Sequence, residues 1–203
     1  MQFHTEFLLS AMSSDHFPNA TRTGDAPEVA FLGRSNVGKS SLINKLLGSK
    51  EAKVSSTPGR TRAINFFALL EGTEAKHKLK PAIIFADLPG YGYAKISKSI
   101  SAEWPKFIEP YLAEREQLAL CICLVDSNIP PQESDIMLIQ ALRQMQRPHL
   151  VVATKADKLS GNTLAKSLAV LKKAIGEDRI LPVSSKSQDG VKTLWPEILS
   201  VMS

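Results

Sequence analysis

Apolar runs without polar alternation recur along the chain, separated by segments with helical periodicity. Such runs predict buried strands, and they lie at residues 28–32, 63–70, 81–86, 118–125, 150–153 and 179–183. Helical patterns lie at residues 39–47, 101–116, 133–144, 162–175 and 191–202. This alternation predicts an α/β fold with a mainly parallel, six-stranded sheet flanked by helices in three layers. Ligands of such sheets bind at the carboxyl ends of the strands.

Residues 1–25 stand apart from this regular order. They mix apolar pieces with a polar stretch, and we expect an N-terminal extension that packs on the domain or leads into it. The domain itself is expected to span residues 26–203, a length that supports one core. No run of about 18 apolar residues predicts a membrane span, and the first residues lack the pattern of a signal peptide. We therefore expect a cytoplasmic location.

Composition changes this picture little. With 43% hydrophobic and 22% charged residues, the chain fits an ordinary globular protein. The net charge of +5 favours an acidic partner such as RNA, DNA or a membrane surface, or simply a basic enzyme. Cys121 and Cys123, the two cysteines, stand in one apolar run. We expect core thiols there, and neither a disulfide framework nor a metal site.

The segment after the first strand, GRSNVGKS, fits the phosphate-binding loop pattern of two glycines followed by Lys-Ser. Glycines let the backbone wrap round phosphates, and the start of a helix favours anions. Lys39 would place its charge on the β- and γ-phosphates, and the Ser40 hydroxyl would bind magnesium. The predicted binding residues are Gly33, Arg34, Ser35, Asn36, Val37, Gly38, Lys39 and Ser40.

A second motif follows the third strand and reads Asp87, Leu88, Pro89 and Gly90. An aspartate at a strand end suits an indirect contact to magnesium. Gly90 can present its amide to a γ-phosphate, which would make the loop sensitive to the nucleotide. The same four residues would also form a simple turn, so the motif gains its meaning from the others.

Two further motifs follow the last two strands. The first, Thr154-Lys155-Ala156-Asp157, carries a carboxylate that can accept hydrogen bonds from guanine N1 and the exocyclic amine. Adenine lacks this donor pair and would leave the charge unpaired. The Lys155 stem would lie along the base. In the second, Ser184-Ser185-Lys186, a backbone amide could reach guanine O6. Taken alone, each could be an ordinary polar turn.

The order of these four motifs, each after a strand, is typical of translation-factor-type GTPases. Three segments resemble the EngB family of bacterial GTPases: GRSNVGKSS at 33–41, TPGRTRAIN at 57–65 and DLPGYGYA at 87–94. The resemblance runs from about residue 28 to residue 202. It implies a P-loop NTPase with a Ras-like G domain that hydrolyses GTP to GDP and phosphate. It also implies a role in large ribosomal subunit assembly, needed for normal cell division and septation.

The resemblance implies roles for residues that the patterns alone do not assign. Gly59, Arg60 and Thr61 would join the nucleotide site, with Thr61 as the switch threonine. Ser40 and Thr61 would hold magnesium, and Lys39, Thr61 and Gly90 would serve catalysis. The loops at 49–62 and 90–99 are the predicted switches, ordered with GTP and loose with GDP.

Departures from the common GTPase pattern shape the expected mechanism. Tyr91 stands where many small GTPases carry a water-positioning glutamine. We therefore predict slow intrinsic hydrolysis, with most catalysis electrostatic. Thr154 stands where asparagine is usual, which predicts moderate nucleotide affinity. Pro105 interrupts the 101–116 helical pattern and should offset or kink its start. Asn36 would either help to hold a potassium ion near the phosphates or merely stabilise the loop turn.

The resemblance implies the large ribosomal subunit or its ribosomal RNA as the partner. A modest cluster of basic residues is consistent with RNA contact, with a solvated charged face as the plain alternative. These basic residues are Arg60, Arg62, Lys76, Lys78, Lys80, Lys95, Lys98, Lys172 and Lys173. We expect a monomer, with no DNA binding and no direct membrane contact. Three other functions stay open: an ATP-using P-loop kinase, a module controlled by nucleotide occupancy alone, and a membrane-associated division protein. Asp157 argues against the first of these.

Overall fold

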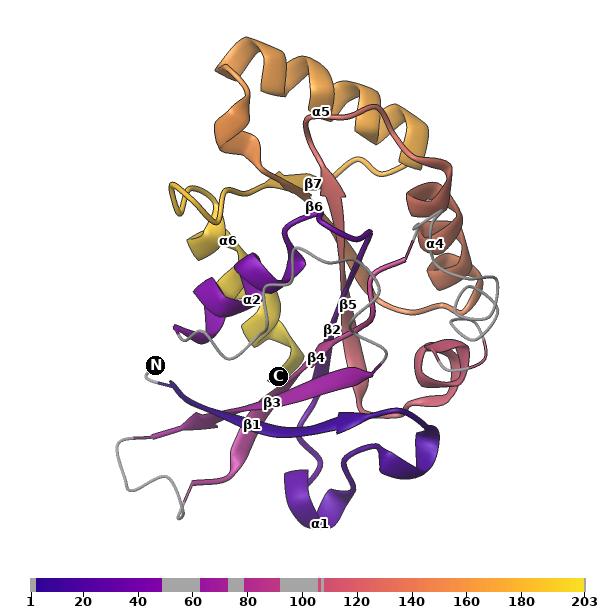
Figure 1. Ribbon diagram of the computed structural model, residues 1–203, viewed down its shortest axis with the longest axis vertical. Coiled ribbons are helices and arrows are strands. Elements are labelled where there is room, and N and C mark those ends of the chain that lie inside the picture. Colours follow the sequence, from indigo (N-terminus) through magenta and orange to yellow (C-terminus); the bar gives the residue numbers. More distant parts are fainter. Residues whose placement is uncertain (1–2, 49–62, 73–78, 92–105, 107, 203) are drawn as a thin grey trace.

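A computed structural model describes residues 3–48, 63–72, 79–91, 106 and 108–202. One seven-stranded sheet runs through the molecule in the order β1-β3-β4-β2-β5-β6-β7 (Figure 1). The strands are β1 (Phe3–Ala11), β2 (Glu28–Gly33), β3 (Ile64–Glu71), β4 (Pro81–Asp87), β5 (Leu118–Asp126), β6 (His149–Thr154) and β7 (Ile180–Pro182). Strands β4, β2, β5, β6 and β7 are parallel to one another, whereas β3 is antiparallel to both its neighbours. The α/β fold with a mainly parallel sheet is confirmed.

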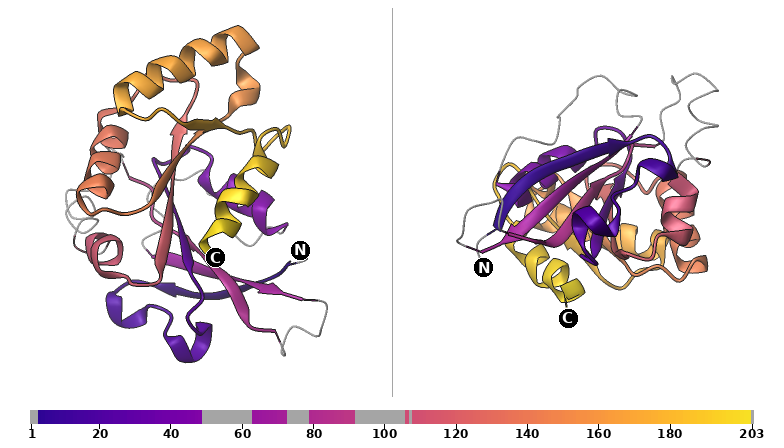
Figure 2. Two further views of the ribbon diagram at one scale, coloured as in Figure 1. Left: turned by 180° about the vertical axis from the view of Figure 1, so that it is seen from behind. Right: turned by 90° about the horizontal axis from the view of Figure 1, so that it is seen from below.

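Helices cover both faces of this sheet. They are α1 (Ala20–Thr23), α2 (Lys39–Leu47), α4 (Glu133–Gln144), α5 (Gly161–Ile175) and α6 (Val191–Leu199), with short 3-10 turns η1 (Ser14–His16), η3 (Ala156–Lys158) and η4 (Ser200–Met202). Residues 108–114 are also helical. Both views in Figure 2 place α2 and α6 on one side of the sheet, and α4 with the helix at 108–114 on the other. The three-layer arrangement predicted from the sequence is therefore present.

Two hydrophobic clusters hold the layers together, one on each face of the sheet. Apolar side chains of α2 and α6 pack on one face, and those of α4, α5 and the helix at 108–114 pack on the other. Within β5 the side chains alternate between the two clusters, as strand geometry requires. Cys121 and Cys123 lie in the cluster on the α4 and α5 side, whereas Ile122 and Leu124 lie in the cluster on the α2 and α6 side. Both cysteines are buried and free, which confirms the predicted core thiols. Burial raises the pKa of the Cys121 thiol to about 12.

The predicted count of six strands is wrong, because the N-terminal segment supplies a seventh. Strand β1 pairs antiparallel with β3 along its whole length, from Phe3 opposite Glu71 to Ala11 opposite Ile64. A bulge between Phe7 and Leu9 shifts the register. Because a bulge breaks the alternation of inward and outward side chains, this segment lacks the regular pattern of a strand. The proposed boundary between an extension at 1–25 and a domain at 26–203 stays a prediction.

The other predicted elements agree closely with the structure. Helices α2 and α4 have the predicted bounds, and Gly176 ends α5 with φ 73°, a left-handed conformation that suits glycine. Of the helical pattern at 101–116, residues 101–105 and 107 lie outside the described residues, Pro105 among them. In the described part of the chain, no helix is long and apolar enough to cross a membrane.

Candidate nucleotide-binding site

The phosphate-binding loop connects the end of β2 to the start of α2, as predicted. Gly33 ends β2 at a crowded position, since a Cβ there would lie 2.8 Å from Val37 Cγ1 and 3.1 Å from Leu124 O and would force a shift. Asn36 and Gly38 have φ values of 64° and 105°, and Gly38 forms the N-cap of α2. Such left-handed residues turn successive amide groups inward and make an anion-binding concavity at the start of a helix. The local structure therefore suits a phosphate chain.

Lys39 and Asp87 form a buried ion pair at the centre of this region. Lys39 Nζ donates a hydrogen bond to Asp87 Oδ1, and the two residues are 9% and 3% exposed. They come from the first turn of α2 and the end of β4. The structure thus brings two sequence motifs together, 48 residues apart in the chain. Nucleotide phosphates would offer Lys39 a second anionic partner in competition with Asp87.

The segment that contains Gly90 packs directly on the phosphate-binding loop. A Cβ on Gly90 would lie 3.0 Å from Ser35 Oγ and 3.1 Å from Ser35 N, so only glycine fits without a shift. The Ser35 amide donates to Tyr91 O at 3.1 Å, and the Tyr91 amide lies 3.4 Å from Gly33 O. These contacts place Gly90 against the loop where the phosphates are expected.

The third motif joins the phosphate-binding loop from the end of β6. Thr154 Oγ1 donates to Val37 O at 2.6 Å, with a second contact to Val125 O at 3.1 Å. The threonine hydroxyl therefore ties the two nucleotide-binding loops together, and Thr154 is buried. This contact was not anticipated, since the sequence suggested only that threonine offers fewer hydrogen bonds than asparagine.

The predicted base-recognition residues also lie together. Ser184 Oγ donates to Asp157 Oδ1 at 2.6 Å, and the Ala156 amide donates to Val183 O at 3.1 Å. The fourth motif therefore orients the carboxylate of the third. Asp157 is exposed, as a carboxylate must be if it is to accept hydrogen bonds from a ligand.

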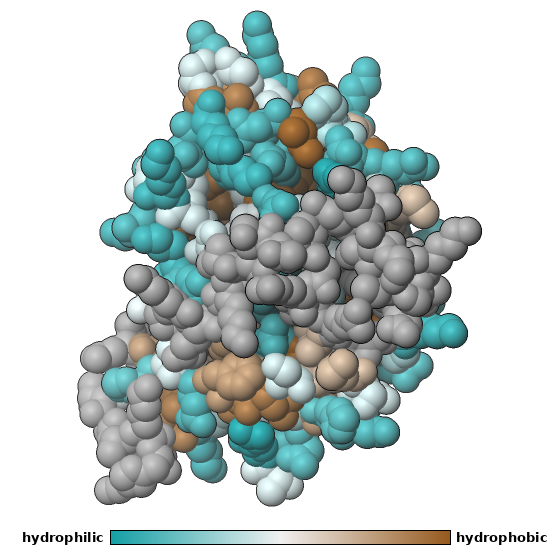
Figure 3. Space-filling model, viewed as in Figure 1, coloured by the Kyte–Doolittle hydropathy of each residue, from teal (hydrophilic) through white to brown (hydrophobic). Residues whose placement is uncertain are grey.

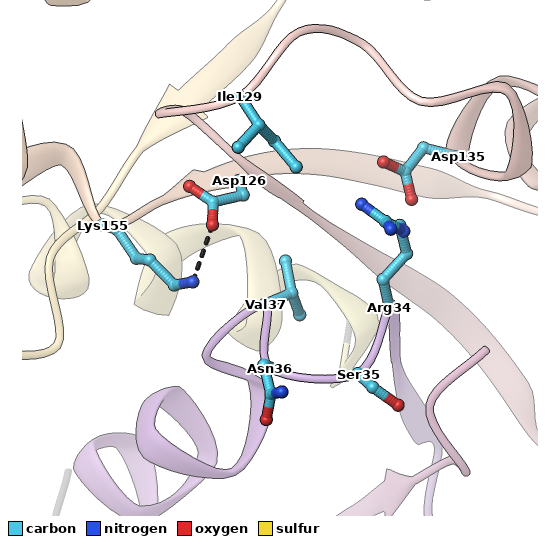
Figure 4. A pocket seen from close by; sticks show the side chains of 8 residues that line it. All are labelled: Arg34, Ser35, Asn36, Val37, Asp126, Ile129, Asp135 and Lys155. Carbon is cyan, nitrogen blue, oxygen red and sulfur yellow. Dashed lines mark hydrogen bonds and ion pairs between the residues drawn. The ribbon is translucent and has the colours of Figure 1, made fainter. Parts of the chain in front are cut away.

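The Lys155 side chain is held by Asp126, a residue that the sequence analysis did not single out. Lys155 Nζ donates to Asp126 Oδ2 at 2.6 Å (Figure 4). Burial alone would raise the pKa of Asp126, but hydrogen bonds from Lys155 and Asn128 outweigh it and lower the pKa. Asp126 ends β5, so the rule that places ligands at strand carboxyl ends could have found it.

A small polar pocket of about 130 Å³ lies beside the phosphate-binding loop. Its lining is Arg34, Ser35, Asn36, Val37, Asp126, Ile129, Asp135 and Lys155. Figure 4 shows the Arg34 guanidinium directed toward Asp135, whereas Asn36 points away from the Asp126–Lys155 pair. Asp135 comes from α4 and was also missed, because a lone carboxylate in a helical pattern carries no sequence signal.

Some predicted residues cannot be placed. Gly59, Arg60 and Thr61 lie outside the described residues, as do most of the predicted switches at 49–62 and 90–99. Of the predicted basic face, Lys80 and Lys173 are exposed and Lys172 is half-buried, while the remaining six residues lie outside the described ranges. Their roles stay predictions.

The donor set near Lys39 suits magnesium, which prefers oxygen ligands. Ser40 follows Lys39 in the first turn of α2, and the Asp87 carboxylate lies beside the same lysine. Among the described residues no group of three or more His, Cys, Asp or Glu side chains could hold a metal ion.

The sheet topology and the four loops at its strand ends define a P-loop GTPase domain. The family model described as "50S ribosome-binding GTPase" matches residues 28–155. A protein of Acidobacterium capsulatum named "Probable GTP-binding protein EngB" is 65% identical over 198 residues, which cover 98% of this chain and 90% of the relative. A protein of the same name from Koribacter versatilis is 52% identical, over 98% of this chain and 94% of its own length.

The chain therefore belongs to the EngB family of GTP-binding proteins, as its motifs suggested, and it is a P-loop GTPase. A solved structure of Era in complex with MgGDPNP and a segment of 16S ribosomal RNA is also similar. Its sequence identity is 25%, its TM-score is 0.68, and the match covers 87% of this chain and 56% of that one.

Proposed function

We propose that this GTPase binds GTP with magnesium, hydrolyses it slowly and acts as a nucleotide-controlled switch in assembly of the large ribosomal subunit. The observation that carries the proposal is the convergence of four loops at the carboxyl ends of β2, β4, β6 and β7. They are joined by the Lys39–Asp87, Thr154–Val37 and Ser184–Asp157 contacts. Assembly of that subunit takes place in the cytoplasm, where we place the protein.

Each loop has a distinct proposed task at the nucleotide. Amides of residues 33–40 and the Lys39 charge bind the phosphates, and Asp157 recognises guanine with Ser184 as its support. Ser40 and Thr61 would hold magnesium, which would neutralise phosphate charge. The family resemblance assigns Gly59, Arg60 and Thr61 to the nucleotide site, and Gly90 would donate its amide to the γ-phosphate.

Slow hydrolysis is supported by the direction of the Tyr91 side chain. Its phenol donates to Asp135 Oδ1 at 2.8 Å, so the side chain is held against α4. A group held there does not orient an attacking water. Catalysis then depends on the preorganised amides and Lys39. The same contact favours a second candidate function, in which nucleotide occupancy rather than turnover controls docking.

Asn36 is the proposed site of potassium activation. It is exposed in the phosphate-binding loop and adopts φ 64°, so its side chain is available to a cation beside the phosphates. Hydrolysis measured with magnesium should be faster in potassium than in sodium. Equal rates in the two salts would assign Asn36 to loop conformation alone.

The proposed partner is the large ribosomal subunit or its ribosomal RNA, bound by a monomer without direct membrane contact. The family model is named for binding to the 50S ribosome, and the Era structure contains ribosomal RNA. Effects on division and septation would then be indirect consequences of subunit assembly. DNA plays no part in this proposal.

Sedimentation through sucrose gradients tests the proposal. Purified protein with GDP or a non-hydrolysable GTP analogue is loaded with isolated ribosomal subunits at two salt concentrations. Co-migration with the large subunit in the GTP form only is expected, with weaker binding at higher salt if basic residues contact RNA. A Lys39→Ala variant is the control and should not co-migrate. Absence of co-migration in both nucleotide states would remove the ribosome from the account.

A further inference from the structure

Asp135 is a buried carboxylate on which two parts of the candidate nucleotide site converge. It lies in the first turn of α4 and is 5% exposed. Tyr91, which follows Gly90, donates its phenol hydrogen bond to Asp135 at 2.8 Å. Arg34 of the phosphate-binding loop directs its guanidinium toward the same carboxylate (Figure 4). Burying a charged group is costly unless it has such partners. A carboxylate at this buried position therefore suggests a role beyond packing.

The backbone of Tyr91 links this carboxylate to the phosphate-binding loop. Tyr91 O accepts the Ser35 amide, and Arg34 and Tyr91 form an isolated parallel bridge. The neighbouring Gly90 is packed on Ser35. The Tyr91 side chain is therefore hydrogen-bonded to α4, while the Tyr91 backbone holds Gly90 beside the phosphate-binding loop.

Electrostatics supports a specific pairing at Asp135. Burial raises the pKa of Asp135, and the Tyr91 hydrogen bond and the Arg34 charge oppose that rise. Burial and the neighbouring Asp135 raise the pKa of Tyr91, so the phenol keeps its proton and remains a donor. Arg34 Nε is buried without a hydrogen-bond partner among the described residues, whereas the Tyr91 hydroxyl donates to Asp135 Oδ1 at 2.8 Å.

We infer that Asp135 is a positioning residue for γ-phosphate recognition, which it serves by fixing Tyr91 and thereby holding the Gly90 amide beside the phosphate-binding loop. This inference rests on the proposed contact between Gly90 and the γ-phosphate. A donor that is already in place loses less conformational freedom when its ligand arrives. The Tyr91–Asp135 contact therefore strengthens binding of GTP relative to GDP, because GDP lacks the phosphate that Gly90 would meet.

The test measures the affinities for GDP and for a non-hydrolysable GTP analogue by displacement of fluorescent GDP. The variants are Tyr91→Phe, Asp135→Ala and the double variant. Each single change should lower the ratio of analogue to GDP affinity by about three- to tenfold, the size expected for one lost hydrogen bond. The double variant should show no larger loss, because both changes remove the same contact. Asp135→Asn keeps an acceptor of similar shape and should recover most of the ratio.

One control variant separates this role from plain stabilisation. Glu133→Ala removes an exposed carboxylate from the same turn of α4 and should leave the ratio unchanged. Three outcomes would each overturn the inference: equal losses of affinity for both nucleotides, additive effects in the double variant, or the same change of the ratio in Glu133→Ala.

Gly90→Ala tests the underlying proposal that Gly90 contacts the γ-phosphate. If it lowers the ratio and the other variants do not, only the inference fails. If Gly90→Ala also leaves the ratio unchanged, the proposed Gly90 contact fails as well.

Discussion

At the scale of single residues, the site depends on short polar contacts between loops that are distant in the sequence. Thr154 reaches Val37 across 117 positions, and Ser184 reaches Asp157 across 27. The motifs identified all four of these residues as parts of the predicted nucleotide site. They did not reveal that two of the side chains bind other loops, because motif spacing carries no information on side-chain rotamers.

Replacing Thr154 tests whether its hydroxyl holds the two loops together. Thr154→Val keeps the shape and removes the hydrogen-bond donor, which leaves Val37 O without that partner. We expect nucleotide affinity to fall about 5- to 30-fold, equivalent to 1–2 kcal/mol. Thr154→Ser keeps the hydroxyl and should bind within about twofold of the wild type. Titration with fluorescent GDP measures both, and equal affinity of the valine and serine variants would assign the threonine no role in binding.

At the scale of elements, the sequence predicts those whose periodicity is undisturbed. The pattern at 133–144 has one apolar side and gives α4 with the same bounds. Strand β1 is missed because its bulge interrupts the alternation. The contact between α4 and Tyr91 is missed for a different reason. Which face of a helix meets a loop depends on how the layers pack, and no local pattern encodes that.

A buried ion pair joins three elements at the base of the sheet. Glu28 of β2 is 1% exposed and accepts hydrogen bonds from Tyr111 at 2.8 Å and Arg115 Nε at 3.0 Å. Arg115 also donates to Pro18 O at 2.7 Å and lies over the Phe17 ring. The N-terminal segment is thus tied to the end of the helix at 108–114.

Removing one partner of this pair should be costly, because the carboxylate of Glu28 would stay buried with its charge uncompensated. Arg115→Ala is expected to lower the free energy of unfolding by about 3 kcal/mol. Arg179→Ala breaks a surface pair with Glu197, in which the arginine side chain is 60% exposed, and should cost no more than about 1 kcal/mol. Urea unfolding of both variants measures the difference. Similar losses would contradict the structural role given to Arg115.

At the scale of the whole molecule, β1 is the edge strand next to β3 and brings the N-terminal segment into contact with the C-terminal helix α6. Phe3 stacks on Trp195 of α6 with ring centroids 5.7 Å apart, and Phe7 meets Phe67 of β3 edge-on. Figure 3 shows apolar surface over β1 and β3, and Phe7 is 48% exposed. The N-terminal segment is therefore an integral part of the sheet in this structure.

Deleting residues 1–12 should destabilise the protein and expose the edge of β3. Loss of the buried Leu8 and Ala11 contacts should cost about 3 kcal/mol, which lowers Tm by roughly 10 °C for a chain of this size. The bare strand edge should also promote self-association. Met12→Ala, at a position 62% exposed, should leave Tm within about 1 °C of the wild type. Thermal unfolding and size-exclusion chromatography measure both effects, and an unchanged Tm after deletion would contradict this role of β1.

The central claim is that loops from four strand ends form a guanine-specific site, with Asp157 oriented by Ser184 to read the base. Competition for bound fluorescent GDP tests it most directly, with unlabelled GTP and ATP as competitors in the presence of magnesium. The account predicts that GTP displaces the probe at concentrations at least about 100-fold lower than ATP, because ATP would leave the Asp157 carboxylate unpaired. Displacement by ATP at the same concentration as GTP would contradict it and favour an ATP-using enzyme.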